Sequence, residues 1–190
     1  MKSEAFVAGQ RAELQFASIA KSKGWHVRSA TRHQNIFNHI DFFISANANT
    51  YSVDVKAQKK ESRNLHQQDE WHVIEFVGVV HPATTIVNFS ENTFDPLNPN
   101  FSLGSGRHGW IYGDATMIAF EMSDEFVIVN RKRLLRHCAN LINFSRRVLV
   151  SQYAKYCVYS RKDRGDLVSY IHKNDLYNIC YLQWKKPTSL

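Results

Sequence analysis

The alternation of apolar and polar side chains predicts a run of strands in the first half of the chain. Residues 25–30, 39–46, 51–58 and 71–80 are each rich in β-branched or aromatic residues. The short polar segment NANT separates the second strand from the third. Because so short a connection is typical of a hairpin, we expect these two strands to be antiparallel neighbours.

A helical pattern precedes these strands. Ser3 is placed to cap a helix that ends at Gly24. Residues recurring at intervals of three and four define the stripe that we expect to face the sheet: Phe6, Gly9, Glu13, Phe16 and Ala20. Glu13 is therefore a core-facing acid or a boundary residue that reaches water. Gly9 in the same stripe indicates a close approach of helix and sheet.

The second half has a different organisation. Residues 88–109 are rich in Gly, Pro, Asn and Ser and predict a long irregular excursion. Strands are expected at 110–121 and 125–130, a short basic helix at 131–142, and a closing strand, helix and strand from 166 to 184. We expect one domain over 1–190, with a core at about 1–80 and a basic elaboration at 110–190.

Polar side chains in two of the predicted strands raise a question about chemistry. In the strand at 51–58, Asp54 and Lys56 share one face, while Val53 and Val55 share the other. By itself this is also the pattern of an ordinary half-exposed strand with a solvated ion pair. Asp41 stands in the apolar segment HIDFFI, where a carboxylate is costly unless a cation meets its charge. If the hairpin brings Asp41 and Asp54 together, oxygen ligands of this kind suit Mg²⁺ or Mn²⁺.

These residues together resemble the PD-(D/E)xK nuclease superfamily, which includes restriction endonucleases and archaeal-type Holliday junction resolvases. The resemblance rests on Glu13 in the helix, Asp41 in HIDFFI, and Asp54 and Lys56 in VDVKAQ, and it covers about the first 80 residues. Ile40 stands where the family name has proline, and Asp54 where Glu is commoner. The resemblance implies an α/β fold of restriction endonuclease-like type, with a central mixed sheet flanked by helices in the order αβββαβ and a basic C-terminal elaboration.

The resemblance also implies a mechanism of phosphodiester hydrolysis that depends on Mg²⁺ or Mn²⁺. Asp41, Asp54 and the backbone carbonyl of Val55 would hold a divalent ion. Lys56 would orient or deprotonate the attacking water, and Glu13 would bind a second ion or a metal-bound water. Gln58 would orient the lysine or the nucleophile. We expect no organic cofactor, and we interpret Asp114 and Glu121 as strand-end polar residues.

Charge favours a polyanionic partner. The chain has 24 Lys+Arg against 17 Asp+Glu, a formal charge of +7, and the excess is concentrated in the C-terminal half. We expect the DNA backbone to be contacted by nine residues: Arg131, Lys132, Arg133, Arg136, Arg146, Arg147, Arg161, Lys162 and Arg164. The tyrosines at 153, 156 and 159 are expected to pack on a helix, with base stacking as the alternative.

The expected function is a metal-dependent DNA endonuclease acting as a homodimer, since two symmetric sites can cut both strands. Restriction-like cleavage, junction resolution and repair remain open, as do RNA as substrate and a non-catalytic DNA-binding module on the same fold. No apolar run of 18 residues and no secretory signal occur, so we expect a soluble, cytoplasmic protein that does not enter a membrane. The three cysteines have no metal-binding or disulfide spacing, and we expect buried free thiols.

Overall fold

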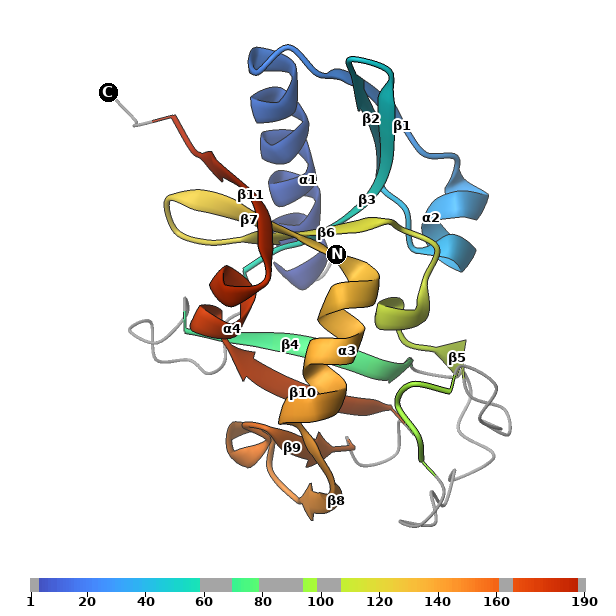
Figure 1. The fold of residues 1–190 in the computed structure, drawn as a ribbon, viewed down its shortest axis with the longest axis vertical. Coiled ribbons are helices and arrows are strands. Elements are labelled where there is room, and N and C mark those ends of the chain that lie inside the picture. Colours follow the sequence, from blue (N-terminus) through green and yellow to red (C-terminus); the bar gives the residue numbers. More distant parts are fainter. Residues whose placement is uncertain (1–3, 59–69, 79–93, 99–106, 161–165, 188–190) are drawn as a thin grey trace.

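A computed structural model describes residues 4–58, 70–78, 94–98, 107–160 and 166–187. The chain forms an α/β fold with two sheets (Figure 1). Its elements in chain order are α1 (Glu4–Ser22), β1 (His26–Ser29), α2 (Arg32–Asn38), β2 (Phe42–Ala46), β3 (Asn49–Lys56), β4 (Trp71–Gly78), β5 (Arg107–His108), the 3-10 helix η2 (Trp110–Tyr112), β6 (Met117–Glu121), β7 (Glu125–Asn130), α3 (Arg131–Leu141), β8 (Asn143–Val148), the 3-10 helix η3 (Ser151–Tyr153), β9 (Cys157–Tyr159), β10 (Leu167–His172), α4 (Lys173–Asn178) and β11 (Cys180–Lys185).

The first sheet has six strands in the order β1-β2-β3-β6-β7-β11. It is mixed, because β3 pairs with β6 in parallel while its other neighbouring strands pair antiparallel. The second sheet has the order β5-β4-β10-β9-β8, with one parallel pair between β8 and β9. The predicted central mixed sheet is therefore present, and the second sheet is an addition that the sequence did not predict.

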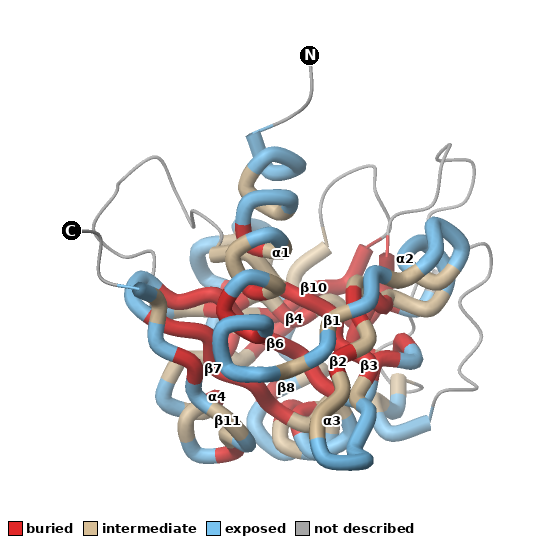
Figure 2. Tube along the Cα trace, turned by 90° about the horizontal axis from the view of Figure 1, so that it is seen from above, coloured by how far each residue is buried: buried red, intermediate tan, exposed pale blue. Residues whose placement is uncertain are grey.

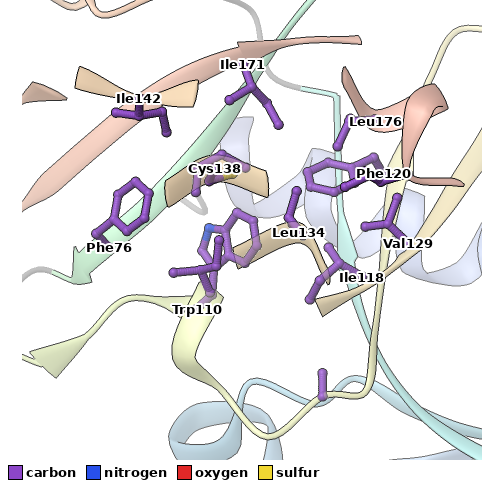
Figure 3. Packing of buried hydrophobic residues seen from close by; sticks show 14 of the residues in the cluster. Phe76, Trp110, Ile118, Phe120, Val129, Leu134, Cys138, Ile142, Ile171 and Leu176 are labelled. Carbon is purple, nitrogen blue, oxygen red and sulfur yellow. The ribbon is translucent and has the colours of Figure 1, made fainter. Parts of the chain in front are cut away.

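Two hydrophobic cores lie on opposite faces of the first sheet, as the strict alternation of its strands requires. One face packs on α1, where Phe16 contacts Phe42, Phe126 and Trp184. The other face contributes Ile118 and Phe120 to a larger core shared with the second sheet, α3 and α4, part of which Figure 3 shows. Both faces are covered, so the middle of the first sheet is buried (Figure 2).

The turn between β2 and β3 sets their register. Asn47 and Ala48 both have left-handed backbone angles, with φ of 48° and 65°. A two-residue turn of this conformation matches the twist of a hairpin. It pairs Ala46 with Asn49, and the last pair of the ladder is Phe42 with Val53. The predicted antiparallel hairpin is confirmed.

Helix α1 confirms part of its predicted pattern. Gly24 ends it with a φ of 81°, and the amide of Trp25 donates to the carbonyl of Ala20. Ser3 lies outside the described residues. The buried positions are Ala12, Phe16, Ile19 and Ala20.

The first turns of α1 do not pack as predicted. Phe6 is 47% exposed, and a Cβ built on Gly9 meets no atom within 4 Å. The predicted close approach at Gly9 is therefore wrong. The first turns of the helix are exposed, as Figure 2 shows, so the apolar spacing there faces solvent.

Other elements differ from the predicted ones for local reasons. Residues 32–38 form α2, so His39 ends a helix and Asp41 precedes β2. Residues 110–116 form η2 and a connection, and β6 begins only at Met117. The tyrosines at 153, 156 and 159 lie in η3, a turn and β9, so their predicted helix is wrong. Of the predicted irregular excursion at 88–109, residues 88–93 and 99–106 lie outside the described residues. Residues 94–98 belong to no helix or strand, and 107–108 form β5.

Several predicted elements in the second half of the chain are confirmed. Strand β7, the basic helix α3, and the closing β10, α4 and β11 all occur where the pattern places them. Cys138, Cys157 and Cys180 are free thiols, the first two buried and the third half-buried. In the described parts of the chain, we find no helix with the length and apolarity needed to span a membrane.

Candidate active site

The candidate site lies where β3 extends beyond its neighbour β2. Since the ladder ends at Val53, the edge of β3 after that residue is not covered by a β2 strand. Asp41 fills this position: its amide donates to the Val53 carbonyl at 2.8 Å, and its Oδ2 accepts from the Val55 amide at 2.7 Å. In an extended strand, the N–H and C=O of one residue point to the same edge. The carbonyl of Val55 therefore faces the Asp41 side of β3.

Helix α2 positions Asp41 from the other side. The side-chain amide of Asn35 donates to Asp41 Oδ1, so each carboxylate oxygen accepts a hydrogen bond. A capping box between Thr31 and Gln34 begins the helix, and His39 ends it in a left-handed conformation with a φ of 53°. The helix that the sequence pattern did not predict is therefore the element that orients one predicted site residue.

Asp54 and Lys56 lie on the face of β3 that looks toward the larger core. Their partners in β6 are Ile118 and Phe120, both members of that core. Lys56 Nζ lies 2.7 Å from Asp54 Oδ2, and the side chain of Asp54 is only 5% exposed. The same ammonium lies 4.7 Å from the centre of the Trp110 ring. A cation over an aromatic face is attracted by the ring, so Trp110 helps to hold Lys56 against Asp54.

Three carboxylates share this region and disfavour one another's charge. Burial raises the pKa of Asp41 to about 7, with a further contribution from the charge of Asp54. Burial also raises the pKa of Asp54, against the opposing effect of Lys56. Burial and the charge of Asp41 raise the pKa of Glu13 to about 7. One lysine does not offset three acids, so the site favours a bound proton or an added cation.

Glu13 reaches the site from α1, on the opposite face of the sheet from Asp54. Its interactions with Asp41, Asp54 and Lys56 are electrostatic. Among the residues that the structure describes, no group of three or more His, Cys, Asp or Glu side chains is arranged to hold a metal ion. The three acids therefore affect one another's pKa, but the described residues do not form the three-carboxylate metal group that the sequence predicted.

Two of the predicted ligands nevertheless suit a hard divalent cation. The Asp41 carboxylate binds the Val55 amide, next to Asp54 in β3, and the charge of Asp54 helps to raise the pKa of Asp41. Asp54 Oδ2 is buried, and Lys56 Nζ lies 2.7 Å from it. Within the described part of the chain, this oxygen accepts no well-directed hydrogen bond. The Val55 carbonyl lies on the same edge of β3. Since Mg²⁺ commonly takes one or two carboxylates and completes its shell with water, this donor set fits Mg²⁺ or Mn²⁺.

A buried acid beside the site was not predicted to belong to it. Glu121 is 1% exposed and accepts from Arg11 at 3.0 and 3.1 Å, from Lys186 Nζ at 3.1 Å, and from the backbone N–H of Gln58 at 3.0 Å. It joins α1, the end of β3 and the segment after β11. The pattern of a single strand places Glu121 at a strand end, as the structure confirms, but it does not reveal the distant partners of that residue.

The predicted DNA-contacting residues occupy three different settings. Arg131 donates to the carbonyls of Ala115 and Ile111, so its guanidinium stabilises the fold. Lys132, Arg133 and Arg136 are exposed on α3, and Arg146 and Arg147 are exposed on β8. The predicted contacts Arg161, Lys162 and Arg164 lie outside the described residues.

Comparisons with known proteins do not assign a function to the chain, so the functional proposal rests on the geometry of the site. No family model matches the chain, and a search of curated proteins finds no match. The structure is similar to that of a bacterial homing endonuclease, I-Ssp6803I, with a TM-score of 0.43 and 10% sequence identity, over 70% of this chain and 74% of that one. At that level, the similarity establishes neither a shared fold nor a shared activity.

Proposed function

We propose that the protein is a metal-dependent endonuclease that hydrolyses phosphodiester bonds of DNA on a nuclease-like fold of the PD-(D/E)xK type. One observation carries the proposal: Asp41 binds the Val55 amide at the uncovered edge of β3, next to the Asp54 and Lys56 pair. Chemistry at a phosphate needs a held cation and a positioned proton carrier, and this cluster offers residues for both.

Each residue has a role that follows from its place. Asp41, Asp54 and the Val55 carbonyl would hold Mg²⁺ or Mn²⁺, which when bound supplies Lewis acidity toward a phosphoryl oxygen and a water of lowered pKa. Lys56 places its ammonium beside Asp54, where it can orient the attacking water or offset negative charge that develops on the phosphate. Glu13 would fix a water at the edge of the site. Gln58, whose backbone N–H donates to Glu121, would use its side chain to orient the nucleophile or Lys56.

DNA is the proposed substrate because charge and site chemistry agree. The formal charge of +7 favours a polyanion, and exposed arginines and a lysine lie on α3 and β8. These groups would bind the phosphate backbone without reading sequence. A homodimer belongs to the same proposal, and sedimentation analysis of the purified protein should give twice the mass of the 22.0 kDa chain.

The test is cleavage of linear, supercoiled, single-stranded and four-way-branched DNA with Mg²⁺ and with a chelator. Asp54→Ala and Lys56→Ala should each reduce cleavage by about a thousandfold or more, because they remove a cation ligand and a charge-stabilising group. Both variants should still bind DNA. Matched controls at exposed positions, Asp124→Ala and Lys23→Ala, should cleave like the wild type.

The outcomes separate the candidate functions. Wild-type activity in Asp54→Ala or Lys56→Ala would refute the proposed site. DNA binding that is unaffected by a chelator, with no cleavage of any substrate, would assign the chain to a non-catalytic binding module. As a readout independent of activity, Mg²⁺ should raise the Tm of the wild type and leave that of Asp54→Asn unchanged.

A further inference from the structure

An exposed apolar tip lies where β8 leads into η3. Leu149 is 92% exposed, Val150 is 46% exposed and Tyr153 is 62% exposed. Large apolar side chains this accessible and this close together form a patch of the kind that marks an interaction site. We call Leu149, Val150 and Tyr153 the apolar tip.

Cations flank this tip. A groove of about 630 Å³ lies beside it, lined by all three tip residues and by Arg146, Gln152 and Lys155. Arg147 is exposed on the same strand and donates to the Ser160 hydroxyl at 3.0 Å. No acidic side chain is among the described residues that line the groove. The surroundings of the apolar tip therefore favour a negatively charged partner.

The tip is held firmly by the structure behind it. The Tyr153 amide donates to the Val150 carbonyl at 3.1 Å, and the Cys157 thiol donates to the Tyr153 carbonyl at 3.0 Å. Cys157 is buried, and Lys155 lies 4.3 Å from the centre of the Trp71 ring. The turn from Val150 to Tyr153 is fixed by these contacts, so it loses little conformational freedom when the tip binds a partner.

We propose that the apolar tip inserts into the minor groove of duplex DNA and kinks it at that point. Proteins that bend DNA place aliphatic side chains between base steps, while neighbouring basic groups bind the phosphates on either side. Leu149 is the inserted side chain, and Arg146 and Lys155 are the phosphate contacts. Tyr153 packs against the sugars or bases that the kink exposes. The choice of DNA rests on the proposed function, and the insertion itself rests on the exposure and charge described above.

The tip and the candidate active site belong to different sheets. Strands β8 and β9 lie at the end of the molecule opposite the β2–β3 turn (Figure 1). The candidate site lies on the first sheet, at the end of β3 away from that turn, whereas the tip follows β8 at the edge of the second sheet. In the proposed complex, the tip would therefore contact a part of the duplex other than the one at the scissile phosphate. Its contribution is to set where along a bent duplex the cut falls.

The experiment measures DNA bending without cleavage. A short duplex labelled at both ends with a donor and an acceptor is titrated with full-length protein in a chelator, and energy transfer reports the bend. A second duplex carries 2-aminopurine at successive positions, where unstacking raises fluorescence. The wild type should raise both signals at one step, while Leu149→Ala should lose both and bind on the order of tenfold more weakly. Leu149→Met should restore them.

A control variant and several outcomes make the test decisive. Leu14→Ala changes an equally apolar residue that is 72% exposed on α1, and it should bend DNA like the wild type. Bending by Leu149→Ala equal to that of the wild type would overturn the proposal. So would tighter binding to single strands or to vesicles of anionic lipid than to duplex. Cleavage with Mg²⁺ but no bending would refute the insertion alone, and bending by a wild type that never cleaves would refute the nuclease alone.

Discussion

At the scale of single residues, Asp41 and Asp54 are two electrostatically coupled carboxylates in a place that disfavours their charge. Each has a raised pKa because burial penalises the ionised form, and Lys56 compensates only in part. A protein that needed only stability would replace such a pair by apolar or neutral side chains. Under the proposed function, a bound cation would offset the charge of this pair.

This electrostatic strain predicts how Asp41→Asn changes stability with pH. The folded-state pKa of Asp41 is about 7, above the ordinary value of 3.8, so the folded protein favours the protonated form. The cost of ionisation is absent below the unfolded pKa and is complete above pH 7. In a chelator, the Tm of Asp41→Asn relative to the wild type should rise between pH 4.5 and pH 8, by on the order of 3 °C.

The Asp41→Asn variant lacks one hydrogen bond at both pH values. The effect of that loss on Tm therefore cancels when the Tm differences at the two pH values are compared. Calorimetry at several pH values measures the difference. A relative Tm that falls as the pH rises would contradict the proposed raised pKa of Asp41.

At the scale of elements, the structure shows which parts of the site a sequence pattern can predict. Local periodicity is a property of one element at a time. It was enough to predict the hairpin, the two faces of β3, and the placement of Glu13 on a helix against the sheet. Helix α2 was missed because its seven residues contain no buried side chain, so they have no apolar period to detect. Its capping residues, Thr31 and Gln34, were the available signal.

Asn35 is the residue through which α2 acts on the site. Asn35→Ala removes the hydrogen bond to Asp41 Oδ1 while leaving the capping box intact. We expect kcat for DNA cleavage to fall by about tenfold, because the Asp41 carboxylate loses a hydrogen bond that orients it. KM and Tm should change little, because the fold does not depend on this bond. His33→Ala on the same helix serves as the control and should retain wild-type kcat. A loss of activity matched by an equal loss of Tm would indicate a purely structural role.

Two glycines provide opposite tests of packing. A Cβ at Gly109 would lie 2.1 Å from the Glu75 carbonyl oxygen, so the backbone must move, and Gly109→Ala should lower the Tm by on the order of 5 °C or more.

Gly9 has open space around it within α1, so Gly9→Ala should stabilise the protein by about 0.5–1 kcal/mol. Denaturant unfolding of both variants measures the difference, and a destabilised Gly9→Ala would show that the helix approaches a neighbour there after all.

At the scale of the whole molecule, the first sheet separates two cores and carries the candidate site at its centre. The α/β class and the mixed sheet were predicted through the family resemblance, and both are present. The second sheet was not predicted, because β4 and β10 are almost 100 residues apart and pair only through the tertiary fold. The same limit applies to Glu121, whose partners Arg11 and Lys186 lie at opposite ends of the sequence.

The distribution of charge over the molecule predicts the salt dependence of binding. Arg146 and Arg147 project from an edge strand of the second sheet. If both contact phosphates, the double variant with alanine at these positions should bind duplex more weakly and reduce the slope of log K against log salt by about 2. The double variant Lys21→Ala and Lys23→Ala, at the end of α1, should leave the slope unchanged. Fluorescence anisotropy across a salt series measures both, and an unaltered slope in the arginine variant would exclude β8 from the phosphate contacts.

The two-residue turn at Asn47 and Ala48 has a consequence for how such a protein can change. Adjacent side chains of β3 point to opposite layers, so a one-residue slip of β3 against its neighbours would place a valine where Asp54 now lies. A longer loop at this tip can absorb inserted residues without such a slip, because β6 also holds β3 in register. The proposed site would therefore tolerate a longer turn and lose its carboxylate only if the strand itself moved.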